Sequence, residues 1–105
     1  MKLNLLVLRC ANIDDSRKFY EQFGLTLTKE KHGKGVEHYS CCIESVVFEI
    51  YPLVKGQLAC NSRLGFRVQN IEQLITKIEI HSQYEFNGKI IYIAVDPDGR
   101  KVEIS

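Results

Sequence analysis

The feature of this sequence that most constrains its fold is a similarity between its two halves. Residues 6–14 (LVLRCANID) align without a gap to residues 64–72 (LGFRVQNIE), with Leu, Arg, Asn and Ile at matched places. A second matched block closes each half, VFEI at residues 47–50 and KVEI at residues 101–104. Two matched blocks in the same order favour a duplication. The sequence therefore predicts a fold built from two similar modules.

Each half is predicted to run strand, helix and then three strands. Asn12 and Asn70 are placed to cap the two helices, since an Asn side chain accepts hydrogen bonds from the first-turn amides. Gly24 is expected to end the first helix, and the second is expected over about residues 71–80. Turns are predicted at residues 32–35 (HGKG) and 96–99 (DPDG). Segments rich in β-branched and aromatic residues predict the later strands at 25–28, 36–43 and 46–51 in the first half, and at 84–86, 90–95 and 101–104 in the second.

The length of 105 residues fits a single domain over residues 1–105, with module 1 at about 1–52 and module 2 at about 61–105. A net charge of +1 gives no electrostatic reason to expect nucleic acid or an anionic membrane as a partner. No apolar run approaches the roughly 20 residues that span a bilayer. The first residues do not read as a signal peptide, so we expect a cytoplasmic protein.

Four cysteines, at positions 10, 41, 42 and 60, form no CxxC pair and no metal-finger spacing. Cys41 and Cys42 are neighbours on a predicted strand and would point to opposite faces, so a bridge between them is not expected. We expect four reduced thiols, mostly buried as small hydrophobic side chains.

Several sequence blocks together resemble a known superfamily. NIDDSRKFY at residues 12–20 leads to FGL at 23–25, FRV at 66–68 precedes NI at 70–71, and the chain closes on DPDGRKVEI at 96–104. In this order, over essentially the whole chain, they resemble the vicinal oxygen chelate superfamily, which includes glyoxalase I, bleomycin resistance proteins and extradiol dioxygenases. The resemblance implies an α+β fold of two tandem βαβββ modules forming a curved mixed sheet around a cleft, often in a homodimer. Because this fold hosts unrelated chemistries, it does not fix the function.

The resemblance also implies where a metal would be held. In metal-dependent members, His or Gln and Glu ligands stand on the first and last strands of each module, and these places correspond here to Leu5, Glu49, Arg63 and Glu103. Leucine offers no lone pair, and a guanidinium carries only donors, so neither can ligate a divalent ion. We therefore expect no family-type metal and no cofactor. Arg63 is expected either to pair with Glu49 or Glu103 or to reach solvent at the strand edge.

The two-residue period of a strand extends this candidate site. With Leu5 facing the cleft, Arg9 shares its face, and the same count places Tyr51 beside Glu49 and Arg67 beside Arg63. His38 lies on a predicted strand and is the one histidine expected to line the cleft, whereas His32 and His81 are expected on the surface. An antiparallel sheet with one solvated face would show the same alternation without any ligand.

Three interpretations follow. The first is a homodimeric protein that binds a small organic molecule without a family-type metal, as bleomycin resistance proteins do. Its ligand-binding residues would be Arg63, Glu49, Glu103, His38, Tyr51, Arg9 and Arg67. The second is a glyoxalase-like lyase or isomerase in which Glu49 or Glu103 is the catalytic base that takes a proton next to a carbonyl. The third is a non-catalytic dimeric interaction module.

Overall fold

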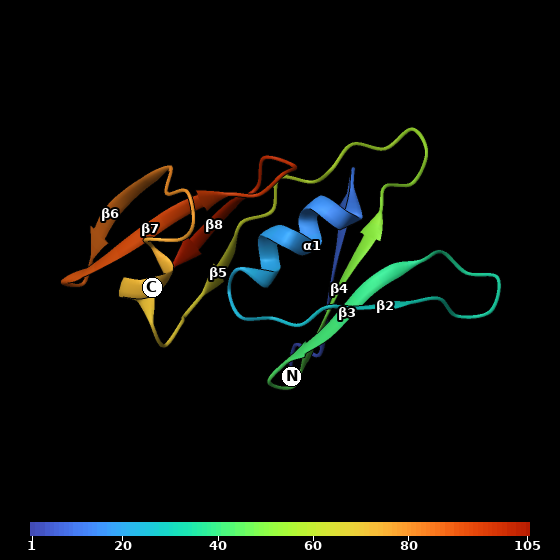
Figure 1. Ribbon diagram of the computed structural model, residues 1–105, viewed down its shortest axis with the longest axis horizontal. Helices are drawn as coiled ribbons and strands as arrows, with labels where there is room; N and C mark the ends of the chain where they lie inside the picture. Colours follow the sequence, from blue (N-terminus) through green and yellow to red (C-terminus); the bar gives the residue numbers. More distant parts are fainter. The chain divides into compact units, whose positions relative to one another are not determined.

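The computed structural model describes all 105 residues (Figure 1). The chain divides into two compact units, Met1–Ala59 and Cys60–Ser105. No helix in either unit is both long and apolar enough to cross a membrane.

The first unit is a four-stranded sheet with one helix. In chain order its elements are β1 (Leu5–Cys10), α1 (Ile13–Glu21), β2 (Thr28–Glu30), β3 (His38–Ile43) and β4 (Val46–Pro52). The strand order in the sheet is β1-β4-β3-β2. The first and last strands pair in parallel, and the other two pairs are antiparallel.

The second unit repeats this order with β5 (Leu64–Phe66), α2 (Ile71–Leu74), β6 (Ser82–Phe86), β7 (Lys89–Val95) and β8 (Lys101–Ile104). Its sheet order is β5-β8-β7-β6, again with the first and last strands parallel. Both units are therefore βαβββ modules with a mixed sheet of their own. The predicted α+β class and the two tandem modules are confirmed.

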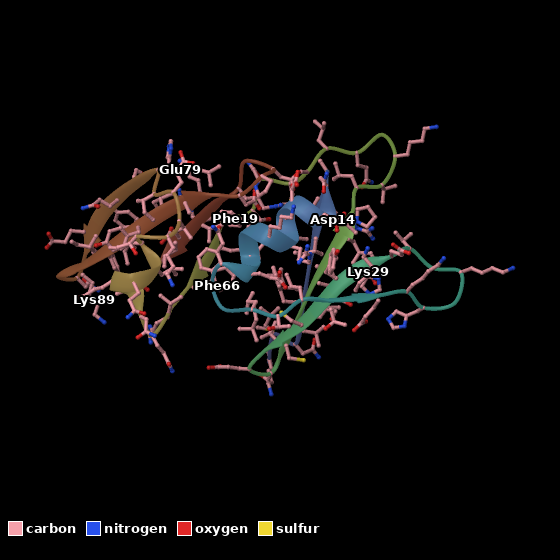
Figure 2. The ribbon with its side chains drawn as sticks, in the orientation of Figure 1. Asp14, Phe19, Lys29, Phe66, Glu79 and Lys89 are labelled. Atoms are coloured by element: carbon pink, nitrogen blue, oxygen red, sulfur yellow. The ribbon has the colours of Figure 1, made fainter.

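Helix α1 covers one face of the first sheet. Tyr20 is fully buried and its ring meets that of Phe48 edge-on, with 5.4 Å between centroids. The Tyr39 hydroxyl on β3 donates a 2.5 Å hydrogen bond to Asp14, which lies in the first turn of the helix (Figure 2). That hydrogen bond holds the pKa of Asp14 below its ordinary value. Packing and a charged hydrogen bond thus fix the helix to the sheet at two points.

Strand alternation separates a covered face from an uncovered one, as the period predicted. Leu8 and Cys10 of β1 are buried on the helix side, whereas Leu5 and Val7 are 48% and 37% exposed. Strand β4 follows the same rule, because its Phe48 and Ile50 are buried while the residues between and beside them are half-buried. The face away from α1 therefore carries a mixture of apolar and polar side chains.

In the second unit, the predicted turn over residues 96–99 joins β7 to β8 around a buried ion pair. The Arg100 guanidinium lies 3.0 Å from the Asp96 carboxylate, and both side chains are fully buried. The other Asp96 oxygen accepts hydrogen bonds from the amides of Asp98 and Arg100. Gly99 has a φ of +88°, which a side chain would disfavour. Sequence reasoning placed the turn correctly and missed that its arginine is interior.

Two predicted elements are wrong in extent. The second helix ends at Leu74 rather than near residue 80, and the following residues form turns. Its cap residue Asn70 makes no side-chain hydrogen bond, and the Thr76 hydroxyl donates instead to the Gln73 carbonyl. Strand β2 begins at Thr28, because the buried Leu27 gives its amide to Glu21 at the end of α1. In both places local hydrogen bonds compete with the regular structure.

The two cap positions provide a matched stability test. The Asn12 side chain accepts hydrogen bonds from the amides of Asp14 and Asp15, each at 3.0 Å, whereas Asn70 accepts none. We expect Asn12→Ala to lower the free energy of unfolding by about 1 kcal/mol, and Asn70→Ala to lower it much less. Urea unfolding followed by circular dichroism measures both. Equal losses in the two variants would contradict the assigned difference in capping.

Candidate functional site

The face of the first sheet that α1 leaves uncovered brings together four of the predicted site residues. We call it the open face; it comprises Leu5, Val7, Arg9, Thr28, Glu30, His38, Ser40, Cys42, Val47, Glu49 and Tyr51. The pairings Ser40↔Glu49 and Val7↔Glu49 place Glu49 in its middle. Leu5 and Val7 make one end apolar, while aromatic and charged side chains occupy the other.

Three planar groups stack across the polar end of the open face. The rings of His38 and Tyr51 are parallel within 8°, with 4.1 Å between centroids. The Arg9 guanidinium lies 4.8 Å from the centre of the Tyr51 ring and donates to the Pro52 carbonyl. Stacking of this kind restricts the rotation of each group. The His38 ring is therefore held in one orientation.

His38 is buried, and its two ring nitrogens have different surroundings. Nδ1 lies 2.9 Å from the Val36 carbonyl oxygen, which can only accept, so Nδ1 carries a hydrogen. Nε2 faces the Tyr51 hydroxyl at 3.3 Å, Glu49 Oε2 at 3.4 Å and Glu30 Oε2 at 3.6 Å. Two carboxylates and a phenol thus converge on a single buried nitrogen.

A second histidine, in the turn after β2, contacts the carboxylate of Glu30. His32 Nε2 lies 3.2 Å from Glu30 Oε2, although its side chain is 75% exposed. The turn is closed by a 2.8 Å hydrogen bond from the Gly35 amide to the His32 carbonyl. A Cβ added at Gly35 would stand 2.9 Å from that carbonyl oxygen, so the turn requires glycine there. The prediction of a turn at 32–35 is confirmed, and so is the surface position of His32.

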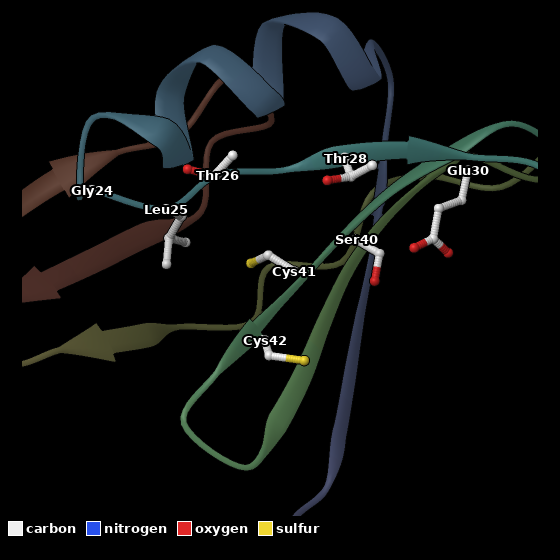
Figure 3. A pocket seen from close by; sticks show the side chains of 8 residues that line it. All are labelled: Gly24, Leu25, Thr26, Thr28, Glu30, Ser40, Cys41 and Cys42. Carbon is white, nitrogen blue, oxygen red and sulfur yellow. The ribbon is translucent and has the colours of Figure 1, made fainter.

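A pocket of about 490 Å³ adjoins this group. Figure 3 shows the carboxylate of Glu30 and the hydroxyl of Ser40 on the same side of the hairpin formed by β2 and β3. The other lining residues are Gly24, Leu25, Thr26, Thr28, Cys41 and Cys42. Its volume is in the range of small-molecule sites.

The second unit places a different group around Glu103. The Arg63 guanidinium donates to Glu103 Oε2 at 3.0 Å, and the Tyr84 hydroxyl donates to Oε1 at 2.7 Å. Of the two predicted outcomes for Arg63, the structure therefore shows pairing with a carboxylate. The hydrogen bond to Glu103 raises the pKa of Tyr84 above its ordinary value. Sequence reasoning did not single out Tyr84.

Arg67, the remaining predicted site residue, is exposed just beyond the end of β5. It lines a separate pocket of about 450 Å³ with Phe86 and Lys89. Its predicted role in ligand binding stays a prediction.

Several known structures share the fold of this chain. A glyoxalase family protein from Enterococcus faecalis is 22% identical, with a TM-score of 0.73 over 98% of this chain and 95% of that one. Oxidase ChaP-H2 is 15% identical, with a TM-score of 0.78 over 99% and 91%. A lactoylglutathione lyase from Agrobacterium tumefaciens is 14% identical, with a TM-score of 0.69 over 98% and 91%. The chain has the fold of the vicinal oxygen chelate superfamily. No family model and no curated protein sequence matches it.

The residues at the metal positions of the vicinal oxygen chelate fold do not fit a metal. Leu5 has no donor atom, and its neighbour along the open face, Val7, has none either. Arg63 is a permanent cation, and it engages one oxygen of Glu103 while Tyr84 engages the other. Among these four positions, Glu49 alone has a carboxylate that binds no lysine or arginine side chain of its own unit.

Sequence reasoning missed Glu30 and His32 as parts of one group with His38. Glu30 and His32 are two residues apart, a spacing that places strand neighbours on one face, and the HGKG turn was recognised. The missing information was the register Glu30↔His38, which brings the two sides of the hairpin together. Alternation alone does not fix which residues of two strands stand opposite each other.

None of the four cysteines is in a disulfide, as expected, but only Cys10 is buried; Cys41 is partly covered, and Cys42 and Cys60 are exposed. The expectation that most would be buried is therefore wrong. Cys60 has a distinct environment, because its Sγ lies 3.4 Å from the Ser62 hydroxyl. Hydrogen bonds from the Ser62 side chain, the Ser62 backbone and Arg100 lower the pKa of Cys60 from 9.0 to about 7.

This lowered pKa predicts thiolate chemistry near neutral pH. The rate of alkylation of Cys60 by iodoacetamide should rise with pH and reach half its maximum near pH 7. Ser62→Ala should move that midpoint upward, because it removes the largest of the stabilising hydrogen bonds. Mass spectrometry of the Cys60 peptide measures the rate separately from the other thiols. An unchanged midpoint in the variant would contradict the role of Ser62.

Proposed function

We propose that this protein binds a small organic molecule on the open face, in the manner of bleomycin resistance proteins and without a family-type metal. The observation that carries the proposal is the make-up of that face. Leu5 and Val7 are 48% and 37% exposed, beside a buried histidine, a half-buried glutamate and a stacked tyrosine. Such a surface suits a molecule with an apolar body and a polar group.

The electrostatics of Glu49 and Glu103 support binding rather than metal-dependent catalysis. Enolate chemistry next to a carbonyl depends on an electrophile that stabilises the developing oxyanion. At Glu103 the cationic group present is Arg63, which is already bound to the carboxylate at 3.0 Å. Glu49 serves best as a polar anchor of the open face, with Arg9, His38 and Tyr51 as its wall. Glu103 and Arg67 belong to the second unit, where they stay predicted ligand contacts.

A dye with an apolar body and one uncharged polar group tests the proposal. We expect N-phenyl-1-naphthylamine to bind the folded protein saturably and to bind the Val7→Lys variant at least about tenfold more weakly, equivalent to about 1.4 kcal/mol, because the lysine replaces part of the apolar end of the open face. The matched control is Val54→Lys, since Val54 is 47% exposed in the segment after β4 and outside the sheet. Fluorescence titration measures the affinities, and cooperative unfolding confirms that each variant is native.

Equal weakening in both variants, or binding that never saturates, would contradict a site on the open face. Loss of binding in Val7→Lys alone would support it.

The alternative function is a glyoxalase-like lyase or isomerase, which the fold shared with a lactoylglutathione lyase keeps open. Glu49 or Glu103 would then take a proton next to the carbonyl of the substrate. The hemithioacetal of methylglyoxal and glutathione is a direct probe. We expect no formation of lactoylglutathione by the wild type above that of the Glu49→Gln/Glu103→Gln double variant. Turnover by the wild type that is lost in the double variant would instead support the lyase function.

The remaining alternative is a dimeric interaction module, in which a second copy covers the exposed Leu5 and Val7. Sedimentation equilibrium of the wild type and Val7→Lys distinguishes it. A dimer that dissociates in the variant, together with no binding of the dye by the wild type, would favour this alternative over the small-molecule site.

A further inference from the structure

The hairpin of β2 and β3 gathers a set of metal-ligating atoms that is separate from the family's metal positions. Glu30, His32 and His38 each offer one ligand atom, and these three atoms lie within 4.8 Å of one another. None of the three occupies the positions of Leu5, Arg63 or Glu103. We propose that Glu30, His32 and His38 bind one divalent transition-metal ion, of the class of Zn²⁺, Co²⁺ or Ni²⁺.

The distances agree with a tetrahedral site. Bonds of about 2.0–2.1 Å to a tetrahedral Zn²⁺ separate neighbouring ligand atoms by about 3.4 Å. Glu30 Oε2 lies 3.2 Å from His32 Nε2 and 3.6 Å from His38 Nε2. Two of the three separations between ligand atoms thus match this spacing, and all three lie within 4.8 Å.

The tautomer of His38 favours metal binding. Its Nδ1 hydrogen is donated to the Val36 carbonyl, so in the neutral ring the Nε2 lone pair points toward the carboxylates of Glu30 and Glu49. A cation placed between this lone pair and the carboxylates is attracted by all three groups, in competition with the Tyr51 hydroxyl, which lies 3.3 Å from the same nitrogen. A backbone carbonyl that fixes the far nitrogen is also the usual outer-sphere partner of a ligating histidine.

The ligand type identifies the class of ion. Two neutral imidazoles and the one carboxylate of Glu30 form a His₂Glu ligand set, which zinc sites in proteins use. Nitrogen ligands select borderline metals over Mg²⁺ and Ca²⁺, which prefer oxygen. A water can occupy the fourth position on the solvent side, where His32 is exposed.

The direct test is a titration of chelator-treated wild-type protein with Co²⁺ alone. We expect one Co²⁺ per chain, with the intense visible absorption of a tetrahedral site, and displacement by one equivalent of Zn²⁺. Absence of stoichiometric binding would overturn the proposal and would mean that the contacts of Glu30 with His32 and His38 are only electrostatic. The proposal does not depend on the small-molecule site, which the dye titration tests separately.

Variants locate the ion. His32→Ala should weaken binding of Co²⁺ at least about tenfold, because loss of even an outer-sphere partner costs that much. His32 is exposed, so this variant should fold normally, and His81→Ala is its exposed control. Weakening by His81→Ala to the same degree would contradict the assignment.

Two further variants exclude other sites. Glu103→Gln should leave the affinity for Co²⁺ unchanged, since Glu103 belongs to the family's metal positions and not to the hairpin. The Cys42→Ser/Cys60→Ser double variant should also leave it unchanged, because these exposed thiols could bind the ion adventitiously. Loss of binding in either variant, with none in His32→Ala, would place the metal elsewhere and overturn the proposal.

Discussion

The parallel pairing of the first and last strands of each unit determines where a site can form in this protein. Parallel neighbours cannot be joined by a tight hairpin, so the chain must cross over and return before the last strand is laid down. In the first unit that crossover includes α1, which buries one face of the sheet through Tyr20 and Phe48. The opposite face receives no covering element of its own unit. Every polar residue that we assign to the first-unit site stands on that face or on the hairpin at its edge.

The duplication produces two sheets with the same framework and different chemistry. Glu49 stands opposite Val7, and Glu103 stands opposite Gly65 at the matching place of the second sheet. A guanidinium and a phenol satisfy Glu103. The corresponding carboxylate of the first unit faces an imidazole instead. A half-buried carboxylate needs a compensating partner, and the two units supply that partner by different means.

The sequence predicted the parts of this structure that depend on strand alternation and on strong turn residues. Alternation assigned the two faces of β1 and β4, because burial on one side of a sheet leaves a two-residue pattern. The turn at residues 96–99 followed from Pro and Gly, although the burial of Arg100 did not. The length of α2 could not be predicted, since the side chain of Thr76 competes for backbone groups and no sequence rule weighs that competition reliably.

The candidate site was predicted in part for a related reason. Leu5 and Arg63 stand at fixed offsets within the repeat, so the sequence alone could predict that two of the metal positions implied by the resemblance lack a ligand atom. His38 was expected on the open side of its strand, and the structure places it there against Glu49. Glu30 and Tyr84 were not identified, because each becomes meaningful only through a register or a contact with a residue distant in the chain.

The closure of the HGKG turn has a consequence for how this chain could change over time. Glu30, His32 and His38 lie within nine consecutive residues, and their geometry depends on Gly35 and on a single strand pairing. The ligand set of the fold family is instead divided between two halves of a chain and fails when either half changes. A hairpin-sized ligand set is inherited as one piece. It can persist after the older positions have mutated, and it can be transferred to another β-hairpin by copying one short segment.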